Sequence, residues 1–325
     1  MNILSVENLS AHIHAPDKTI YLLKDISFTL KRGETLAVIG ESGCGKSTLC
    51  KTILGLLPSH FQTGGVLTFF KDDNTFVKIS NRDGSRFKNL HGSNMGMVFQ
   101  DAAGSINPLF KCGKQIVEVL KEHISNSPLR DKHQAVQLIE QVGLSDPTDV
   151  FNKYPHQLSG GMSQRIALAL ALAGNPDLLI ADEPTSSLDS TAKIQFLELL
   201  RELKTKNNLS LILVTHNLND ALRFSDSILV MYNGSGIEYR HTADLQQAPA
   251  HPYTKALLDI RAALNQGRLP RPIPGETPSI TRSIPGCPFH PRCPKTSDIC
   301  RDTFPLPTAL SESHFVCCHH PLETN

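Results

Sequence analysis

The sequence GESGCGKS at residues 40–47 fits the pattern G-x-x-x-x-G-K-[ST]. The apolar run Thr35–Ile39 precedes it and predicts a buried strand, and Ser47–Leu57 follows it with helical spacing. Glycines allow backbone N–H groups to surround a polyphosphate, and the start of a helix adds a positive dipole. A glycine-rich turn met by chance is the alternative, which the flanking strand and helix patterns disfavour. We therefore expect a phosphate-binding loop, whose residues are Gly40, Glu41, Ser42, Gly43, Cys44, Gly45, Lys46, Ser47 and the adjacent Thr48.

Two side chains of this loop have residue types that suit a magnesium–polyphosphate complex. The ammonium of Lys46 would neutralise charge on the β- and γ-phosphates. The hydroxyl of Ser47 would ligate Mg²⁺, which prefers hard oxygen donors. The loop thus predicts a nucleoside triphosphate with its magnesium ion.

A second candidate site follows the apolar run Leu178–Ala181, which ends in Asp182 and Glu183. A buried strand that ends in two carboxylates places them at a sheet edge, where ligands bind in open α/β sheets. Asp182 suits Mg²⁺, and Glu183 suits the polarisation of an attacking water. A solvated acidic pair in a turn is the alternative, and the phosphate loop in the same chain disfavours it.

A third segment, Leu158–Arg165, reads LSGGMSQR and precedes a helical pattern that is apolar on all sides. Ser159 is a good N-cap, and Gly160 and Gly161 expose backbone amides at the start of that helix. A capped helix with a flexible entry is the alternative. One nucleotide hardly needs two phosphate-binding helix ends on one chain, so the second end suggests a nucleotide held by another subunit.

The remaining patterns indicate a layered α/β domain followed by a different region. Residues 1–33 alternate like antiparallel strands, and Leu211–Val214 is a further apolar run. Residues 101–157 have helical patterns without strand signals, and Thr191–Leu203 is amphipathic after the N-cap candidate Asp189. Prolines and cysteines become frequent after about residue 245. We place a boundary there, which divides the chain into residues 1–245 and 246–325.

Composition excludes several classes of protein. The chain has 325 residues, of which 40% are hydrophobic and 19% charged, with a net charge of +1. These values exclude a disordered chain, and the near-zero charge gives no general reason to bind nucleic acid. The longest apolar run, Ile166–Gly174, is too short to cross a bilayer, and MNILSVENLS does not resemble a secretory signal. We therefore expect a cytoplasmic chain.

The motif order GESGCGKS, VFQD, LSGGMSQR, LLIADEPTSSLD and VTHN resembles an ABC-type ATPase subunit over most of residues 3–240. The resemblance implies an α/β ABC-type P-loop ATPase fold. It would have an N-terminal antiparallel β-subdomain, a RecA-like core, a helical subdomain at about residues 101–175 and a small Cys-rich C-terminal extension. One departure is Ala102, where the subgroup often has proline.

The resemblance also implies roles for individual residues. Gln100 would meet Mg²⁺ and the attacking water and sense the membrane partner. Glu183 would be the catalytic carboxylate, and His216 the switch histidine that contacts the γ-phosphate. Ser159, Gly160 and Gly161 would grip the γ-phosphate of ATP on the opposite subunit, and Asp189 would help to join the two sites. Tyr21 is the nearest candidate for stacking on adenine, although a half-buried strand tyrosine is an equal alternative.

The sequence of the tail indicates which subgroup of the ABC-type ATPases the chain resembles. HPYTKALL at residues 251–258, IPGETPS at 273–279 and GCPFHPRCP at 286–294 resemble the C-terminal extension of dipeptide and oligopeptide importers. That subgroup also includes uptake systems for nickel and antimicrobial peptides, so the tail does not define the cargo.

Four cysteines in this tail form a candidate metal site: Cys287, Cys293, Cys300 and Cys318. The tail is rich in proline and we expect it to have little apolar core, so that it needs a staple. A zinc site, an iron–sulfur cluster, or free or disulfide-bonded thiols are all open from the residues alone. The resemblance implies a 4Fe-4S cluster. It also favours Cys318 over its neighbour Cys317, because it places one cysteine directly before a histidine.

Taken together, the resemblance implies the ATP-hydrolysing subunit of an ABC importer, peripheral on the cytoplasmic face of the inner membrane. Its partners would be two permease subunits, a homologous second ATPase in a heterodimer, and an extracytoplasmic solute-binding protein. The alternatives are an importer of nickel or another non-peptide cargo, a soluble ABC ATPase in translation or DNA maintenance, and a metal-sensing regulator. A single phosphate loop without a long heptad run disfavours the soluble ATPase.

Overall fold

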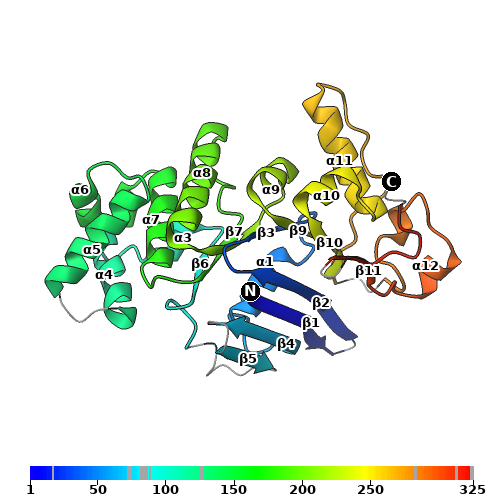
Figure 1. Cartoon of the computed structure of the whole chain (residues 1–325), viewed down its shortest axis with the longest axis horizontal. Coiled ribbons are helices and arrows are strands. Elements are labelled where there is room, and N and C mark those ends of the chain that lie inside the picture. Colours follow the sequence, from blue (N-terminus) through cyan, green and yellow to red (C-terminus); the bar gives the residue numbers. More distant parts are fainter. Residues whose placement is uncertain are drawn as a thin grey trace. The chain divides into compact units, whose positions relative to one another are not determined.

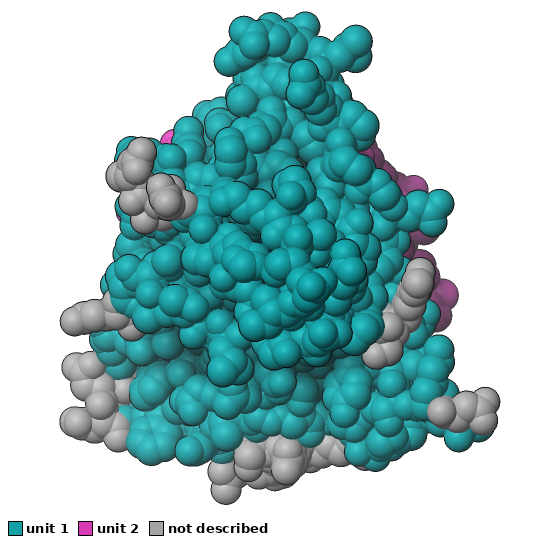
Figure 2. Space-filling view, turned by 90° about the vertical axis from the view of Figure 1, so that its right-hand side faces the viewer, with its two compact units in different colours: residues 1–84, 213–325 teal, residues 85–212 magenta. Residues whose placement is uncertain are grey.

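The computed structural model describes most of the chain as two compact units. Unit 1 comprises residues 1–84 and 213–325, and unit 2 comprises residues 85–212 (Figures 1 and 2). The described residues are 1–16, 18–71, 75–80, 87, 89–124, 128–281, 284–311 and 314–322.

Unit 1 is built on a mixed sheet with the strand order β5-β4-β1-β2-β10-β9-β3, to which β12 and β11 are added beside β10. Its strands are β1 (Asn2–Ala15), β2 (Lys18–Lys31), β3 (Thr35–Ile39), β4 (Gln62–Phe70), β5 (Phe76–Ser80), β9 (Ser227–Tyr232), β10 (Ser235–His241), β11 (Thr308–Ser311) and β12 (His314–Val316). The antiparallel pairing of β1 with β2 confirms the strands predicted for residues 1–33.

The phosphate loop follows β3, the last strand in this order. All five residues of β3 are buried, and β3 runs parallel to β9, as expected for an apolar run covered on both faces. The helix α1 (Lys46–Ile53) begins directly after the loop, which confirms the predicted strand–loop–helix order. The other helices of unit 1 are α9 (Leu218–Phe224), α10 (Thr242–Gln247), α11 (Pro252–Asn265) and α12 (Asp298–Asp302).

Unit 2 combines a small parallel sheet with a group of helices (Figure 1). β6 (Met95–Val98) pairs in parallel with β7 (Leu178–Asp182), beside which β8 (Ser210–Val214) begins before the chain returns to unit 1. The helices are α3 (Ala102–Ser105), α4 (Cys112–His123), α5 (Pro128–Gln141), α6 (Pro147–Asn152), α7 (Gly160–Leu172) and α8 (Ser190–Asn207).

The helix α7 shows why a helix that is apolar on all sides suits this position. It packs against α3, α4 and α5 as well as against β6, so several faces meet other elements. Ile166, Leu168 and Ala169 are fully buried as a result. The buried helix predicted for this segment is confirmed.

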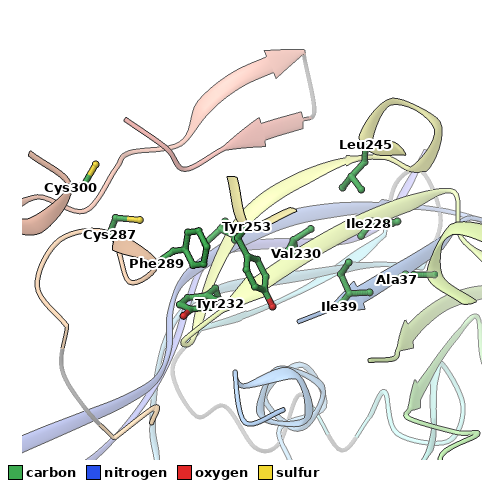
Figure 3. Packing of buried hydrophobic residues seen from close by; sticks show 12 residues of the cluster. Ala37, Ile39, Ile228, Val230, Tyr232, Leu245, Tyr253, Cys287, Phe289 and Cys300 are labelled. Carbon is green, nitrogen blue, oxygen red and sulfur yellow. The ribbon is translucent and has the colours of Figure 1, made fainter. Parts of the chain in front are cut away.

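The Cys-rich tail is anchored in the core of unit 1 (Figure 3). Phe289 is 1% exposed, and its ring centroid lies 5.3 Å from those of both Tyr232 and Tyr253. Cys287 and Cys300 belong to the same hydrophobic cluster as Ile39, Val230 and other strand residues. The expectation that this segment has little apolar core is therefore wrong in one respect, because the strands of unit 1 supply a core that the local sequence does not contain.

The predicted boundary at about residue 245 differs from the division into compact units. The segment after residue 245 lies in unit 1 together with the N-terminal strands.

Among the described residues, none of the helices is both long and apolar enough to span a membrane.

Candidate functional site

The phosphate loop needs glycine where α1 begins. Gly45 is the N-cap residue of α1 and has a φ of 107°, in the region that side-chain-bearing residues rarely adopt. A Cβ at this position would lie 2.8 Å from the carbonyl oxygen of Leu22 and 3.6 Å from Cδ1 of Ile280. Both the backbone angle and the surrounding atoms therefore exclude a larger residue.

Lys46 lies inside the loop rather than in solvent. It is 5% exposed, and its Nζ donates to the carbonyl oxygens of Gly40 at 2.9 Å and Glu41 at 3.1 Å. The backbone N–H of Cys44 also donates to the Glu41 oxygen, at 3.3 Å. The carbonyl of Glu41 is thus a shared acceptor that fixes where the ammonium can stand.

Another part of unit 1 holds the base of this loop. The N–H of Gly234 donates to the carbonyl oxygen of Cys44 at 2.9 Å. Burial raises the pKa of the Cys44 thiol, so this side chain is a neutral packing group. Ser42 and Gly43, by contrast, are exposed at the tip of the loop. The loop therefore has a fixed base and an accessible tip, as a polyphosphate site requires.

Glu41 contacts the C-terminal region. Its carboxylate Oε2 accepts from Thr277 Oγ1 at 2.7 Å and from Arg292 at 2.8 Å, and its backbone N–H donates to the hydroxyl of Tyr253 at 3.1 Å. All three partners come from the C-terminal region, so the second residue of the loop joins the loop to that region.

His216 lies at the end of a strand next to the one that carries the loop. The N–H of Thr215 donates to the carbonyl oxygen of Val38, one residue before β3 ends. The next residue, His216, is exposed, and Asn217 caps α9 by accepting from the N–H groups of Asn219 and Asp220. The capped helix thus fixes the backbone that carries the histidine.

Tyr21 is 44% exposed, and its ring centroid lies 5.0 Å from that of His12. Both side chains line a cavity of about 580 Å³, whose other lining residues are Ser10, Lys24, Asp25, Ile284, Gly286, Pro288 and Phe304. Phosphate-loop residues are not among them. The stacking of adenine on Tyr21 stays a prediction.

In unit 2, two parallel strands bring three of the predicted residues to one sheet edge. Val98 of β6 lies opposite Ala181 of β7. Gln100 follows β6 by two residues, while Asp182 ends β7 and Glu183 comes next. Since the carboxyl ends of parallel strands meet at the same edge, the amide and both carboxylates share one side of the sheet.

The two carboxylates differ in their surroundings. Asp182 is 3% exposed, whereas Glu183 is only partly buried. Glu183 has a φ of 45°, in the left-handed region that costs a residue with a side chain about 1–2 kcal/mol. Such strained conformations concentrate at functional sites, which agrees with a catalytic role for this carboxylate.

The LSGG segment forms the start of α7 as predicted. Ser159 is the N-cap residue, and its Oγ accepts from the N–H of Met162 at 3.3 Å. A Cβ on Gly160 would meet nothing within 4 Å among the described residues, and one on Gly161 would meet only Leu188 Cδ2 at 3.9 Å. This helix start is therefore open, with its amide dipoles accessible to an anion.

Asp189 is the N-cap residue of α8. Its Oδ1 accepts from the backbone N–H groups of Thr191 and Ala192, both at 2.9 Å. The predicted N-cap is confirmed, whereas the role of Asp189 in joining two sites stays a prediction.

The candidate cysteines of the tail lie in surroundings that favour neutral thiols. Burial raises the pKa of the Cys287 thiol to about 12, and Cys318, Cys293 and Cys300 raise it further. Burial likewise raises the pKa values of Cys293 and Cys318, on both of which Cys300 acts. The cysteines that act on Cys317 are Cys287 and Cys318. In the described part of the chain, groups of three His, Cys, Asp or Glu side chains arranged to hold one metal ion are not present.

Sequence reasoning missed the contacts of the loop with Tyr253, Thr277 and Arg292. Tyr253 stood in the quoted HPYT segment, and Arg292 stood beside Cys293 in the quoted GCPFHPRCP segment. Their sequence distance from Glu41, more than 200 residues, gave no local signal. The one available hint was an acidic residue inside a loop that binds anions, since such a charge needs a partner.

Two family models match the chain. The model described as "ABC transporter" matches residues 23–186, and that described as "Oligopeptide/dipeptide transporter, C-terminal region" matches residues 237–300.

Curated relatives match over nearly the whole length. The dipeptide transport ATP-binding protein DppD of Bacillus subtilis is 39% identical over 97% of this chain and 94% of the relative. The oligopeptide transport ATP-binding protein OppD of Salmonella typhimurium is 37% identical over 99% of this chain and 94% of its own length.

The fold also matches a solved structure. The ATP-binding cassette MJ0796 in a dimeric post-hydrolysis state with ADP and Pi has a TM-score of 0.63 at 27% identity, covering 74% of this chain and 98% of that one. The observed strands, loops and helix starts therefore form an ATP-binding cassette, and the chain belongs to the ABC transporter family.

Proposed function

We propose that this chain is the ATP-hydrolysing subunit that powers an ABC importer for dipeptides or oligopeptides. The carrying observation is that similarity to dipeptide and oligopeptide transport ATP-binding proteins extends over 97–99% of the chain, including the C-terminal region. The chain would work as a peripheral subunit on the cytoplasmic face of the inner membrane.

In this function the residues of the phosphate loop and the residues at the ends of β6 and β7 have separate tasks. Lys46 and the loop amides bind the polyphosphate, while Ser47, Asp182 and Gln100 serve the magnesium ion. Glu183 is the general base that polarises the attacking water. The position of the acidic pair and the glutamine at one sheet edge supports this division.

His216 contacts the γ-phosphate and reports its presence. An imidazole at the end of a strand can donate to a phosphate oxygen from a fixed backbone, which the capped helix α9 provides. The exposed position of this histidine supports the role.

Transport requires two ATPase subunits that close around ATP, with Ser159, Gly160 and Gly161 of one subunit on the nucleotide of the other. ATP binds the closed pair and not the open one, so binding drives closure and hydrolysis allows reopening. The open helix start of α7 supports this role, because nothing in its own described surroundings fills the space above Gly160. We infer a heterodimer with a homologous ATPase, two permease subunits and an extracytoplasmic solute-binding protein as partners.

Transport by the reconstituted complex tests the proposal. Vesicles that contain the permeases, both ATPases and the binding protein are supplied with a panel of dipeptides, longer peptides and nickel ions. ATP-dependent uptake of peptides is expected. Uptake of nickel alone would assign a metal cargo. In a separate detergent pull-down of the chain, bound nucleic acid in place of permeases would overturn the importer.

We also propose that Cys287, Cys293, Cys300 and Cys318 hold a 4Fe-4S cluster. The proposal rests on the resemblance of the tail to the C-terminal region of oligopeptide and dipeptide transporters, and the choice of Cys318 over Cys317 rests on the same resemblance. When bound, such a cluster would cross-link a segment that has few strands and helices. Iron and sulfide analysis after anaerobic purification is the test: about four irons per chain are expected, and equimolar zinc without iron would contradict the cluster.

A further inference from the structure

The C-terminal region grips the second residue of the phosphate loop at three points. The hydroxyl of Tyr253 accepts from the backbone N–H of Glu41, and the side chains of Thr277 and Arg292 both donate to its Oε2. Backbone and side chain of one residue are thus held from the same region, which a single surface ion pair would not achieve.

Arg292 is itself held in a fixed orientation. Its side chain is 6% exposed, and besides Glu41 it donates to the hydroxyl of Tyr232 at 3.1 Å and to the carbonyl oxygen of Pro274 at 3.0 Å. A planar guanidinium with several partners cannot rotate without breaking all of these bonds together. The arginine is therefore a rigid connection rather than a mobile charge.

The base of this connection is the aromatic cluster of Figure 3. Tyr232 and Tyr253 pack with their rings 4.9 Å apart, and each ring contacts Phe289. Phe289 lies three residues before Arg292, so the tail segment that carries the arginine is anchored in the core by its phenylalanine. The tyrosine hydroxyls then extend from this cluster to Arg292 and to Glu41.

The other end of the connection is Lys46. The carbonyl oxygen of Glu41 accepts from Lys46 Nζ at 3.1 Å. Glu41 therefore contacts both Arg292, through its carboxylate, and the ammonium of Lys46, through its carbonyl. The Glu41 N–H that Tyr253 holds shares a planar peptide unit with the carbonyl of Gly40, which also accepts from Lys46 Nζ, at 2.9 Å. The contacts to Glu41 Oε2 hold the side chain of the same residue.

We propose that Arg292 is a positioning residue for nucleotide binding, which acts through Glu41 to hold the phosphate loop and Lys46 in the geometry that a triphosphate requires. The inference rests on the proposed ATPase function and extends it. It makes the Cys-rich extension a support of the nucleotide site, through its contacts with Glu41.

The test is a titration of the purified chain with a non-hydrolysable ATP analogue, measured by isothermal calorimetry. Calorimetry reports the number of competent sites separately from the Kd, so partial misfolding lowers the first and a positioning defect raises the second. Arg292→Ala should raise the Kd by about tenfold or more, as expected for the loss of a charge-assisted hydrogen bond next to the site. Arg292→Lys should restore part of the affinity, because it keeps the charge but not the planar set of donors.

Arg301→Ala is the matched control. This arginine is also adjacent to a candidate cysteine, but its side chain is 61% exposed and pairs with Asp298 instead of the loop. Its Kd should equal that of the wild type. Thr277→Val, which removes one hydrogen bond to Glu41 at nearly constant volume, should raise the Kd in the same direction but by less.

A double-mutant cycle decides whether Arg292 acts through Glu41. In a Glu41→Ala background, Arg292→Ala should have little further effect on the Kd. Equal effects of Arg292→Ala with and without Glu41, or an unchanged Kd in the single variant with all sites competent, would overturn the inference. Failure of the wild type to bind the analogue would instead refute the ATPase function itself.

Discussion

The chain has two glycine-rich helix starts, and they are built in opposite ways. At the start of α1, Gly45 is surrounded by the backbone of Leu22 and the side chain of Ile280, and Lys46 is buried inside the loop. At the start of α7, Ser159 is exposed and a Cβ on Gly160 would meet nothing within 4 Å in the described part of the chain.

This difference teaches how one kind of anion site serves two purposes. Both helix starts present backbone amides and a positive dipole. The first is held from several sides, so it is preorganised for a ligand that it binds by itself. The second leaves its amides open to a ligand that arrives from outside, as expected if the triphosphate is bound by a partner subunit.

The largest expected effect is the loss of ATP hydrolysis without loss of ATP binding when Glu183 is replaced. Glu183→Gln should lower the turnover of ATP by about 10²- to 10⁴-fold, because the attacking water loses its general base, while ATP binding at both helix starts is preserved. Steady-state hydrolysis and analogue binding are measured together, with the exposed Glu202→Gln of α8 as the control. Hydrolysis at the wild-type rate would show that the base lies elsewhere.

The next effect concerns the enclosed helix start. Lys46→Ala should weaken ATP binding by on the order of 10- to 100-fold, because a charge-assisted hydrogen bond to phosphate is lost. The control Lys51→Ala removes an exposed lysine of the same helix and should bind normally. Equal affinity of the Lys46 variant and the wild type, measured by calorimetry, would remove the contrast between the two helix starts.

Alanine substitutions at the two glycines test the contrast directly. Gly45→Ala should destabilise the protein by about 1–2 kcal/mol or more, since the left-handed backbone is strained for alanine and its Cβ would meet the Leu22 carbonyl. Gly160→Ala should leave the Tm nearly unchanged but lower ATP hydrolysis by the assembled transporter, because the new methyl group occupies the open space. Thermal unfolding and hydrolysis of both variants give the answer; a large loss of Tm for Gly160→Ala would mean that this start is packed.

The last prediction concerns the pH dependence of stability in the C-terminal region that supports the enclosed helix start. Burial lowers the pKa of His251 to about 3, and its Nε2 has no hydrogen-bond partner among the described residues. The unfolded chain therefore binds this proton at a higher pH than the folded chain does. The stability that the neutral histidine contributes is present above about pH 6.5 and is lost as the pH falls toward about 3.

His251→Asn keeps an N-cap for α11 but cannot titrate. Between pH 5 and 6 it should remove a slope of up to about 1.4 kcal/mol per pH unit from the free energy of unfolding. Chemical denaturation at several pH values measures the slope, and the exposed His60→Asn should retain the wild-type dependence. An unchanged slope for the His251 variant would mean that this group is not buried as a neutral imidazole.

Local patterns predicted much of the fold. The strands β3, β7 and β8, the helix after the loop, and the N-caps Ser159 and Asp189 all lie where the sequence indicated. These elements depend on interactions between residues that are close along the chain, such as apolar runs and side-chain caps. Family motifs added the candidate roles of Gln100, Glu183 and His216, which no local pattern could assign.

The sequence by itself determined the phosphate loop, the acidic strand end and the open helix start, because each is a short stretch whose backbone conformation its own residues specify. Only the tertiary structure revealed that Glu41 is held by Tyr253, Thr277 and Arg292, and that Phe289 is anchored among strand residues. The physical reason is that these contacts join residues far apart in the chain, and the burial of Arg292 and Phe289 exists only after the sheet of unit 1 has formed.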